Sequence, residues 1–390
     1  MSNIKQYDCV VVGAGIAGCS LAHFLSKYSK SVLLIDKNKD VAYGASGAAG
    51  AFLSPLLGKP NSFKDLITKS LKFSVDYYRN NYPNEITNCG TCRIPKNDED
   101  REKFKTYIPY MDFEFKEYKN GYFFEIGSVV NPYNICKKLS EKITKTFNYE
   151  VKDILFSDNS WIINSEIKAN KLFLTTGADT SLIKEKYFNI RAVWGQKIDI
   201  TSTSNIDINY HKECSISKSL ALINEEKNLI SIGATHNRFE KDILESSYNL
   251  SLCNINEIQH NEQTKAIMQK DIEKLLNLAK DIAPLKDIEV VDVKIGARAS
   301  SVDYFPMVGK LIDSEKSFKK YPHLKNGTHI KDENLEMIEN LYVLNGVGGR
   351  GFVLSLYLAN CLVENIFNET PLPKDITNFR LFKRWAKKNK

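Results

Sequence analysis

The feature that most constrains the fold is a glycine-rich turn near the start of the chain. Residues 9–12 form a short apolar run typical of a buried strand, and the turn at residues 13–18 follows it immediately. Residues 20–28 then place leucine and phenylalanine side chains on one face at helical spacing. A second apolar strand at residues 31–35 is followed by the acid Asp36. This order of strand, glycine turn, helix, strand and acid predicts a βαβ unit that binds a dinucleotide.

The three glycines of the turn have separate predicted roles. Gly13 permits the tight turn, Gly15 lets the backbone approach a pyrophosphate, and Gly18 lets the helix pack closely on the strand. The N-terminus of the helix offers free N–H groups and a partial positive charge to the phosphates. Asp36 follows 18 residues after Gly18, which is close to the spacing expected for an acid that holds ribose hydroxyls. The turn alone leaves open whether the dinucleotide is FAD or NAD.

Three later segments add small residues to the same predicted site. Residues 44–50 contain only glycine, alanine and serine, which suits a loop against a large flat ligand, the alternative being an ordinary flexible loop. Residues 171–178 form an apolar strand that ends near Gly177, and such strand ends meet the ligand in open α/β sheets. Residues 345–351 form a second glycine loop before an apolar helix at 354–367. The positive N-terminus of that helix would stabilise negative charge on a reduced flavin ring.

These motifs resemble the D-amino-acid oxidase-like family of FAD oxidoreductases, and the resemblance spans essentially the whole chain. Residues 127–132 resemble the stretch before the family's second flavin-domain segment, and residues 194–196 resemble its crossing into the substrate domain. Residues 233–235 resemble a strand end of that domain. The most specific late signature is at residues 296–298, and it continues through residues 303–309. The resemblance implies FAD as the cofactor.

The motifs and the resemblance together predict an α/β fold with a Rossmann-like FAD-binding domain and an antiparallel-sheet, α+β substrate domain. Because the flavin motifs occur at the start, middle and end of the chain, the FAD domain must be assembled from separated segments. We expect these segments at 1–85, 127–180 and 290–390, and the substrate domain at 86–126 and 181–289. The predicted FAD-binding residues are Gly13, Ala14, Gly15, Ile16, Ala17, Gly18, Asp36, Lys37, Ala45, Ser46, Gly47, Ala49, Gly50, Val151, Thr176, Gly177, Gly346, Gly348, Gly349, Gly351 and Phe352.

Within this family, the likeness is greatest to the FAD domain of bifunctional enzymes that modify the wobble uridine of tRNA. The similar stretches are residues 44–55, 303–309, 348–351 and the tail at 378–387. The methyltransferase half of those enzymes has no counterpart before the first strand. The resemblance therefore implies that any methyl transfer is performed by a separate protein.

Two arginines are predicted to act on the substrate. Arg298 matches, by its place in the motif, the arginine that binds the substrate carboxylate in the family's amino-acid oxidases. A guanidinium suits that role because its fork holds a carboxylate through two hydrogen bonds. Arg350, in the second glycine loop, is the other candidate, for a substrate anion or a flavin carbonyl. The alternative for both residues is a structural salt bridge.

The resemblance implies a tRNA wobble uridine, or 2-thiouridine, that carries a carboxymethylaminomethyl group. Oxidation of its glycine-like C–N bond would give an imine, and hydrolysis would release glyoxylate and leave aminomethyluridine. The carboxylate on this nucleoside explains why a tRNA enzyme would keep the arginine of an amino-acid oxidase. The flavin accepts the hydride, so the protein mainly aligns the substrate and stabilises charge.

The C-terminus carries positive charges interleaved with aromatic residues, which suits phosphate contact and base stacking on RNA. The charged residues are Arg380, Lys383, Arg384, Lys387, Lys388 and Lys390, and the aromatic ones are Phe379, Phe382 and Trp385. The alternative is a frayed helix whose charges are solvated. The net charge of +7 for the whole chain has the same two interpretations, and a lysine-rich surface explains it without RNA.

The cysteine and hydropathy patterns predict a cytoplasmic protein without a membrane span. Eight cysteines are scattered over the chain rather than spaced as a disulfide framework. The longest apolar stretch, residues 9–25, is too interrupted to cross a bilayer. Cys89 and Cys92 form a CxxC pair, but no second pair stands at zinc spacing, so we expect no metal site and leave the pair's role open. The lysine-rich stretch 314–333 is predicted to be a mobile insertion.

Two other functions are compatible with most of these motifs. A free-standing oxidase or dehydrogenase of a small amine, such as glycine, sarcosine or a D-amino acid, shares all of them except the tail and the greatest-likeness stretches. A flavin-binding scaffold without turnover shares the cofactor site but does not need Arg298. The substrate-facing residues therefore decide between the three functions.

Overall fold

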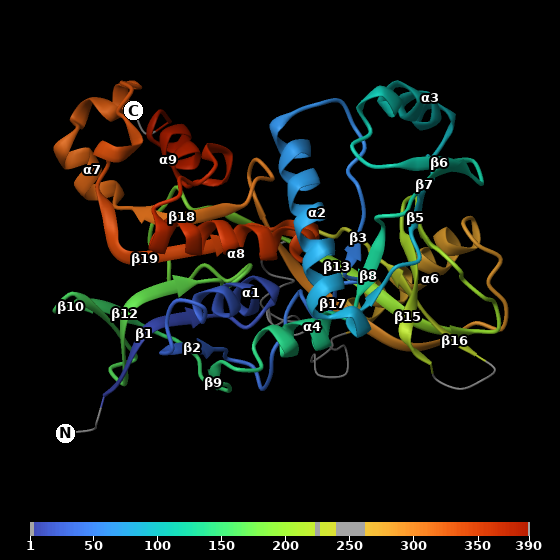
Figure 1. Cartoon of the computed structure of the whole chain (residues 1–390), viewed down its shortest axis with the longest axis horizontal. Helices are drawn as coiled ribbons and strands as arrows, with labels where there is room; N and C mark the ends of the chain where they lie inside the picture. Colours follow the sequence, from blue (N-terminus) through green and yellow to red (C-terminus); the bar gives the residue numbers. More distant parts are fainter. Residues whose placement is uncertain (1–3, 223–226, 239–261, 389–390) are drawn as a thin grey trace.

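The computed structural model describes residues 4–222, 227–238 and 262–388 of the chain. It contains two eight-stranded sheets, which lie in two halves of the molecule (Figure 1). A small three-stranded sheet made of β3 (Phe52–Leu53), β8 (Ser128–Val130) and β4 (Ile86–Thr87) lies in the region between them.

The first large sheet is mainly parallel and contains the N-terminal strand. Its order is β10-β11-β12-β1-β2-β9. In addition, β19 pairs with the C-terminal part of β12, and β18 pairs with β19. In register, Val12 lies beside both Ile35 and Leu174, so neighbouring strands end at the same edge, where open α/β sheets bind ligands. The strands are β1 (Lys5–Val12), β2 (Val32–Ile35), β9 (Thr144–Thr146), β10 (Ile154–Ser157), β11 (Ser160–Ile163), β12 (Ile167–Leu174), β18 (Met307–Ile312) and β19 (Met337–Asn345).

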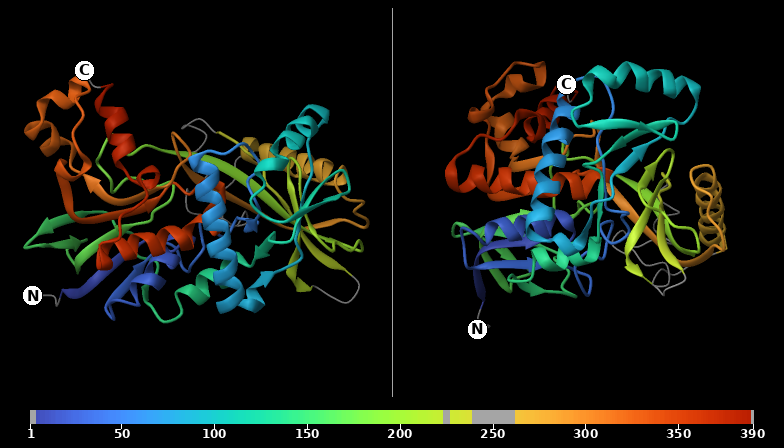
Figure 2. Two further views of the ribbon diagram at one scale, coloured as in Figure 1. Left: turned by 45° about the horizontal axis from the view of Figure 1, so that its top comes forward. Right: turned by 45° about the vertical axis from the view of Figure 1, so that its right-hand side comes forward.

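Helices cover both faces of this sheet because its central strands are apolar on both sides. Val11 of β1 points into one buried cluster, and its neighbours Val10 and Val12 point into the other. The first cluster is closed by α1 (Ile16–Leu25), α2 (Ser62–Asn81), α4 (Pro132–Leu139) and α8 (Gly351–Asn368), and the second by α9 (Phe379–Ala386) with α7 (Ser314–Lys320). Figure 2 shows α1 and α8 side by side against the sheet.

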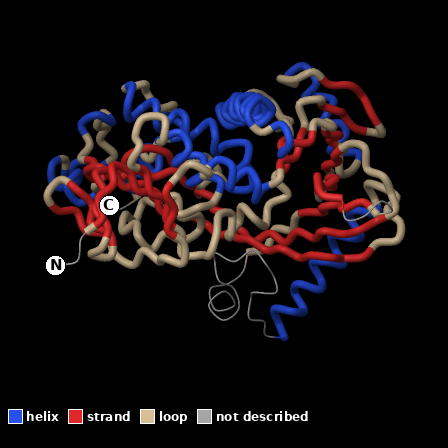
Figure 3. Tube along the Cα trace, turned by 60° about the horizontal axis from the view of Figure 1, so that its bottom comes forward, coloured by secondary structure: helices blue, strands red, loops and turns tan. Residues whose placement is uncertain are grey.

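The second sheet is mostly antiparallel and has the order β17-β13-β16-β15-β14-β5-β7-β6. Its strands are β5 (Thr91–Arg93), β6 (Phe115–Tyr118), β7 (Gly121–Phe124), β13 (Ile190–Ser202), β14 (Asn209–His211), β15 (Ser215–Leu222), β16 (Asn228–Gly233) and β17 (Glu289–Ser301). The long strands β13 and β17 run from this half towards the parallel sheet (Figure 3), and α6 (Glu262–Lys280) contacts β13 and β16. A further helix, α3 (Asp98–Tyr107), lies beside β6 and β7 (Figure 1).

The sheet membership differs from the predicted segments at two places. Strand β17 falls in the predicted FAD segment 290–390, yet it pairs with β13 along nearly its whole length. Conversely, Tyr187 and Phe188 fall in the predicted substrate segment but are buried against the parallel sheet. Both differences arise because pairing and packing with distant residues set these boundaries, and no local change in composition marks them.

The C-terminal aromatic residues are wholly or partly buried, which contradicts the expectation that all three are free to stack on bases. Phe382 is fully buried, and Phe379 and Trp385 pack in the same apolar cluster. Their spacing of three residues places them on one face of α9, where Phe382 and Trp385 pack against Tyr187 and against Phe318 of α7. Lys383 pairs with Asp332, whereas Arg384, Lys387 and Lys388 are exposed. Lys390 lies outside the described residues.

The stretch predicted to be a mobile insertion is largely folded. It contains α7, and Phe318 of that helix packs its ring 5.5 Å from the ring of Trp385. Leu324, in the turn after α7, is buried in the same cluster. This stretch therefore completes one face of the parallel sheet. Among the described residues, no helix is both long enough and apolar enough to cross a membrane.

Candidate active site

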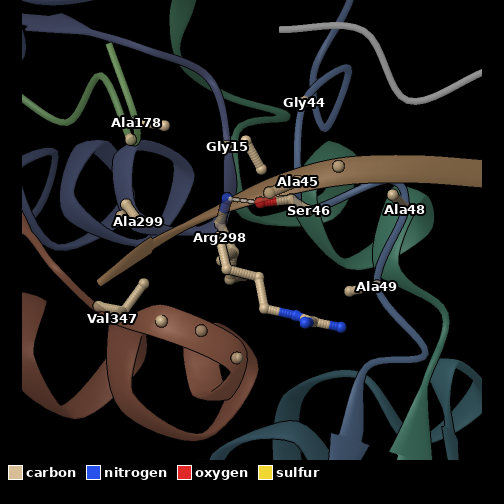
Figure 4. Close-up of a pocket in the computed structure, with 18 of the residues that line it drawn as sticks. Gly15, Gly44, Ala45, Ser46, Ala48, Ala49, Ala178, Arg298, Ala299 and Val347 are labelled. Carbon is tan, nitrogen blue, oxygen red and sulfur yellow. Dashed lines mark hydrogen bonds between the residues drawn. The ribbon is translucent and has the colours of Figure 1, made fainter. Parts of the chain in front are cut away.

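A cavity of about 620 Å³ lies where the carboxyl ends of the parallel strands meet the long strands of the second sheet. Small residues form much of its wall, including Gly15, Ala45, Ala48 and Ala178, and Arg298 enters it from β17 (Figure 4). Segments far apart in the chain line it together, as the prediction of a site assembled from several segments requires. Such a size is typical of a ligand pocket.

The glycine turn before α1 leaves no room for side chains. Gly13 has a φ of 107°, and a Cβ placed there would stand 2.6 Å from the carbonyl oxygen of Thr175. A Cβ on Gly18 would stand 1.7 Å from the carbonyl oxygen of Gly13. Glycine is therefore required at both positions, at Gly13 for the turn and at Gly18 for the contact of α1 with the strand end.

Asp36 lines the cavity and also holds the turn in place. Its Oδ2 accepts a hydrogen bond from the backbone N–H of Ala14 at 2.6 Å, and its Oδ1 accepts one from the N–H of Asn38 at 2.8 Å. On the same wall, Lys37 donates to the carboxylate of Asp179 at 3.0 Å. The carboxylate of Asp36 is thus fixed beside the cavity, at the place where a ribose would lie after a dinucleotide-binding turn.

The loop of small residues at 44–50 lies against both halves of the molecule. Ser46 Oγ accepts a hydrogen bond from the N–H of Ile16 at 2.9 Å, which is the first residue of α1 (Figure 4). A Cβ on Gly296 of β17 would stand 2.8 Å from the Cα of Ala45. This contact explains why larger residues are excluded from the loop and from the facing strand.

The second glycine loop places the start of α8 at the cavity. Gly348, Gly349, Gly351 and Phe352 line the cavity, and no side chain caps the first turn of α8. Asn345, at the end of β19, donates its side-chain N–H to the carbonyl of Gly177 at 3.0 Å and so joins two strand ends. The positive end of an 18-residue helix therefore faces the cavity.

Most of the predicted FAD-binding residues line this one cavity. Those on its wall are Gly13, Gly15, Ile16, Ala17, Asp36, Lys37, Ala45, Ser46, Ala49, Gly50, Val151, Thr176, Gly177, Gly348, Gly349, Gly351 and Phe352. Ala14, Gly18, Gly47 and Gly346 do not line it and support the wall from behind. A wall of glycine and alanine between two helix N-termini, with an acid beside the first, fits an extended dinucleotide with a flat ring system.

Arg298 has the surroundings of a ligand-binding residue rather than of a salt bridge. Its Nη1 donates to the carbonyl of Thr235 at 3.0 Å, and within the described part of the chain no carboxylate pairs with it. The guanidinium lies over Gly195 of β13, where a Cβ would stand 2.2 Å from Nη2. Burial lowers the pKa of Arg298 to about 10, so the side chain is cationic at neutral pH. Figure 4 shows it directed away from Gly15.

Arg350 also lies on the cavity wall, but at a different place. Its Nη1 donates to the carbonyl of Ser54 at 3.3 Å, and burial lowers its pKa to about 10. Arg298 influences the pKa of His236, whereas Arg350 influences those of Arg93 and His211. The two predicted arginines therefore bond to different segments, Arg298 to Thr235 after β16 and Arg350 to Ser54 after β3.

Several residues on or beside the cavity were missed by the sequence analysis. His211 and His236 line it, and Arg93 lies next to His211 in the paired strands β5 and β14. His236 directly follows the strand end at residues 233–235, which was a signal that could have identified it, whereas no spacing links Arg93 to His211. Tyr304 also lines the cavity and is 63% exposed. Its place inside the motif at 303–309 was a signal that could have identified it.

The CxxC pair lies away from the cavity and is not activated. Burial raises the pKa of Cys92 to about 11, and the pKa of Cys89 is also raised by burial. Cys92 donates to the carbonyl of Tyr118 at 3.4 Å. Both thiols are thus protonated at neutral pH, which does not favour a redox role.

The FAD dependent oxidoreductase (DAO) family matches residues 8–365 of the chain. Among curated relatives, the tRNA 5-methylaminomethyl-2-thiouridine biosynthesis bifunctional protein MnmC of Campylobacter hominis is 23% identical, over 95% of this chain and 62% of that protein. The protein of the same name from Campylobacter jejuni subsp. jejuni serotype O:6 is 27% identical, over 94% of this chain and 56% of that protein. The chain thus spans little more than half of the length of these relatives.

Among solved structures, glycine oxidase from Bacillus cereus has the same fold, with a TM-score of 0.67 at 17% identity. The match covers 94% of this chain and 96% of that one. The family match extends from β1 into α8 and includes both glycine loops, the small-residue loop at 44–50 and Arg298. The chain therefore belongs to the DAO family and is an FAD-dependent oxidoreductase.

Proposed function

We propose that this enzyme removes the carboxymethyl group from carboxymethylaminomethyluridine, or its 2-thio form, at the wobble position of tRNA. The products are glyoxylate and aminomethyluridine. The names of the relatives supply the tRNA nucleoside. The observation that carries the proposal is Arg298, a cationic guanidinium on the cavity wall that, within the described residues, donates to the carbonyl of Thr235 and pairs with no carboxylate.

The chain's own residues would hold the cofactor along the cavity wall. The turn at Gly13 and Gly15 would receive the pyrophosphate, Asp36 the ribose, and the loop at 44–50 with the start of α8 the ring system. Bound FAD supplies the oxidant that takes up two electrons from the substrate. The small side chains of Ala45 and Ala49 leave a flat surface for that ring system.

Arg298 would bind the carboxylate of the substrate's glycine-like arm and so set the position of the adjacent methylene carbon. A guanidinium holds a carboxylate in a fixed plane, which orients the C–H bond that is broken. The methylene carbon loses two electrons and the amine becomes an imine. Water then adds to the imine carbon, the C–N bond breaks, and glyoxylate leaves while the amine stays on the uridine.

Tyr304 supports a nucleic-acid substrate over a small amine. The residue is 63% exposed although it lies on the cavity wall, so an aromatic side chain stands at the entrance. Exposed rings at such places stack on unpaired bases, and the wobble base belongs to a single-stranded loop. The exposed cations Arg384, Lys387 and Lys388 remain candidates for phosphate contacts in the same complex.

We also propose that the product passes to a methyltransferase. The relatives are named for the biosynthesis of a methylaminomethyl nucleoside, and the reaction proposed here leaves an aminomethyl group. A methyl donor and an enzyme that transfers the methyl group must therefore act after this step. Cytoplasmic localisation, where tRNA is modified, is part of the same proposal.

The experiment is to incubate the FAD-loaded protein with tRNA from cells that lack this gene and to analyse the nucleosides by mass spectrometry. We expect carboxymethylaminomethyluridine to disappear, aminomethyluridine to appear, and one glyoxylate to form for each. Arg298→Ala should abolish the conversion while FAD absorbance is retained. Unchanged nucleosides, together with rapid flavin bleaching by glycine or sarcosine, would instead establish an oxidase of small amines.

A further inference from the structure

A second group of basic side chains, two of them cationic arginines, surrounds the segment that follows β3. Arg350 comes from the loop before α8, Arg93 from β5 and His211 from β14. The parallel pairing of β5 and β14 sets His211 directly beside Arg93. His211 and Arg350 line the cavity, and Arg93 lies behind them.

The hydrogen bonds of this group end on neutral atoms. Arg93 Nη1 donates to the carbonyl of Pro55 at 2.8 Å and to Ser54 Oγ at 3.4 Å, and Arg350 Nη1 donates to the carbonyl of Ser54 at 3.3 Å. The ring of Phe52 lies 5.7 Å from the ring of His211. One short segment thus contacts all three basic residues.

Two buried nitrogen atoms of the group have no hydrogen-bond partner among the residues that the structure describes. Arg93 Nε and His211 Nδ1 are enclosed by protein and make no hydrogen bond. Leaving such a nitrogen unbonded costs about 1–3 kcal/mol, so native structures usually satisfy it. Both residues keep a small exposed surface, which for His211 faces the cavity.

The positive charge of the group also lacks a counterion. Among the described residues, no carboxylate forms an ion pair with Arg93 or Arg350, and Asp100 attracts Arg93 only from a distance. Burial, together with the nearby charge of Arg350, lowers the pKa of Arg93 to about 10. Burial and both arginines hold the pKa of His211 well below its usual value. Glu213 lines the cavity nearby but is exposed.

We propose that Arg350, Arg93 and His211 form an oxyanion subsite, separate from Arg298, that binds a second anionic group of the substrate. This inference rests on the proposed function, since Arg298 already takes the carboxylate beside the reacting carbon. Guanidinium groups bind carboxylates and phosphates alike, so the second anion is either type of oxyanion. It comes from the phosphate of the wobble nucleotide or from the second carboxylate of a dicarboxylic amine.

The first test uses inorganic phosphate as the probe on the FAD-loaded protein. We expect phosphate to raise the melting temperature and to perturb the flavin absorbance of the wild type. Arg93→Gln should weaken phosphate binding at least tenfold, and Arg298→Ala should leave it intact. Arg101→Gln is the matched control, because Arg101 on α3 pairs with Asp98 far from the cavity. A purely structural role for Arg93 would lower the melting temperature without changing phosphate affinity.

The second test identifies the source of the anion by matched substrate pairs. One arm compares carboxymethylaminomethyluridine with its 5′-monophosphate, and the other compares sarcosine with iminodiacetate, which adds only a second carboxylate. We expect KM to be at least tenfold lower for the doubly anionic member of one pair, and Arg93→Gln to remove that difference. The substrate pair that shows this difference in KM identifies the source of the anion.

Equal KM values within both pairs, with no phosphate binding, would overturn the subsite. That result remains distinct from failure of the proposed function. If tRNA is not modified but phosphate binds and iminodiacetate is preferred, the subsite stands and the tRNA substrate does not. If tRNA is modified but phosphate does not bind, the subsite alone is wrong.

Discussion

The guanidinium of Arg380 is hydrogen-bonded to both carboxylate oxygens of Asp303, which lies 77 residues earlier in the chain. Nε donates to Oδ2 at 2.8 Å and Nη2 to Oδ1 at 3.0 Å, and Nη2 also donates to the carbonyl of Phe305 at 2.8 Å. These bonds fasten α9 to the turn after β17, in which Tyr304 has a φ of 67°. The basic C-terminus thus contributes a structural arginine beside the cavity rather than a free phosphate contact.

Breaking this pair is expected to destabilise the protein in a pH-dependent way. Arg380→Gln should lower the free energy of unfolding by about 2 kcal/mol at pH 7, since hydrogen bonds to charged groups are lost. Burial raises the pKa of Asp303, but the hydrogen bonds and charge of Arg380 outweigh it and leave the pKa below its usual value. The stabilisation is therefore complete above about pH 4, the ordinary range of an aspartate, and is lost as the pH falls through the lowered pKa.

Urea unfolding at pH 7 and at pH 3 measures this effect. The difference between wild type and Arg380→Gln should be smaller at pH 3. Arg384→Gln, an exposed position on the same helix, should change the free energy of unfolding by less than about 0.5 kcal/mol at both pH values. A difference that is the same at both pH values would show that Arg380 acts through packing rather than through the carboxylate.

Gly195→Ala is expected to displace Arg298 without disturbing the fold. The new Cβ would stand 2.2 Å from Nη2 and 2.4 Å from Cζ, which are the movable end of a long side chain. We expect the free energy of unfolding to change by less than about 1 kcal/mol. KM for a carboxylated amine such as sarcosine should rise at least tenfold, whereas turnover of dimethylamine, which lacks the carboxylate, should not change. An equal effect on both amines would place Arg298 outside the carboxylate site.

Gly18→Ala tests whether the contact of α1 with the glycine turn holds the cofactor site. The added Cβ would collide with the backbone of Gly13, which cannot move aside without opening the turn. We expect the free energy of unfolding to fall by about 3 kcal/mol and the purified protein to lose FAD absorbance. In Gly50→Ala the new Cβ meets open space, so the unliganded protein should keep its stability. Equal stability of the two variants would contradict the role given to Gly18.

The parts of the site that the sequence predicted are those encoded within one short segment. The turn at Gly13 and the acid Asp36 lie in a single βαβ unit, so spacing alone predicts that they meet. The contact between Gly296 and Ala45 joins strand β17 to the loop at 44–50, about 250 residues earlier, and no local spacing predicts it. For the same reason, the sequence does not predict that Arg93 and His211 are neighbours, because only the pairing of β5 with β14 brings them together.

The C-terminal segment shows why charge patterns alone could not separate an RNA-binding tail from a packed helix. Arg380 and Lys383 have their carboxylate partners in Asp303 and Asp332, both remote in sequence. The position of Phe382 in the sequence is equally compatible with a residue that stacks on a base and with a core residue, and the structure shows that it is buried. Whether the segment is an RNA-binding tail or a packed helix depends on whether another part of the protein covers it, and this is decided by the tertiary structure.

Tyr304→Ala is expected to separate tRNA from small substrates. The ring stands exposed at the cavity entrance, and stacking on one base contributes about 1–3 kcal/mol. KM for tRNA should therefore rise about tenfold or more, and KM for sarcosine should stay within a factor of two or so of the wild type, because a small amine does not reach the ring. Tyr304→Phe keeps the aromatic face and should restore the wild-type KM for tRNA. Steady-state kinetics with both substrates on the three proteins measures this, and a loss that Tyr304→Phe fails to restore would mean that the hydroxyl, rather than stacking, binds the nucleoside.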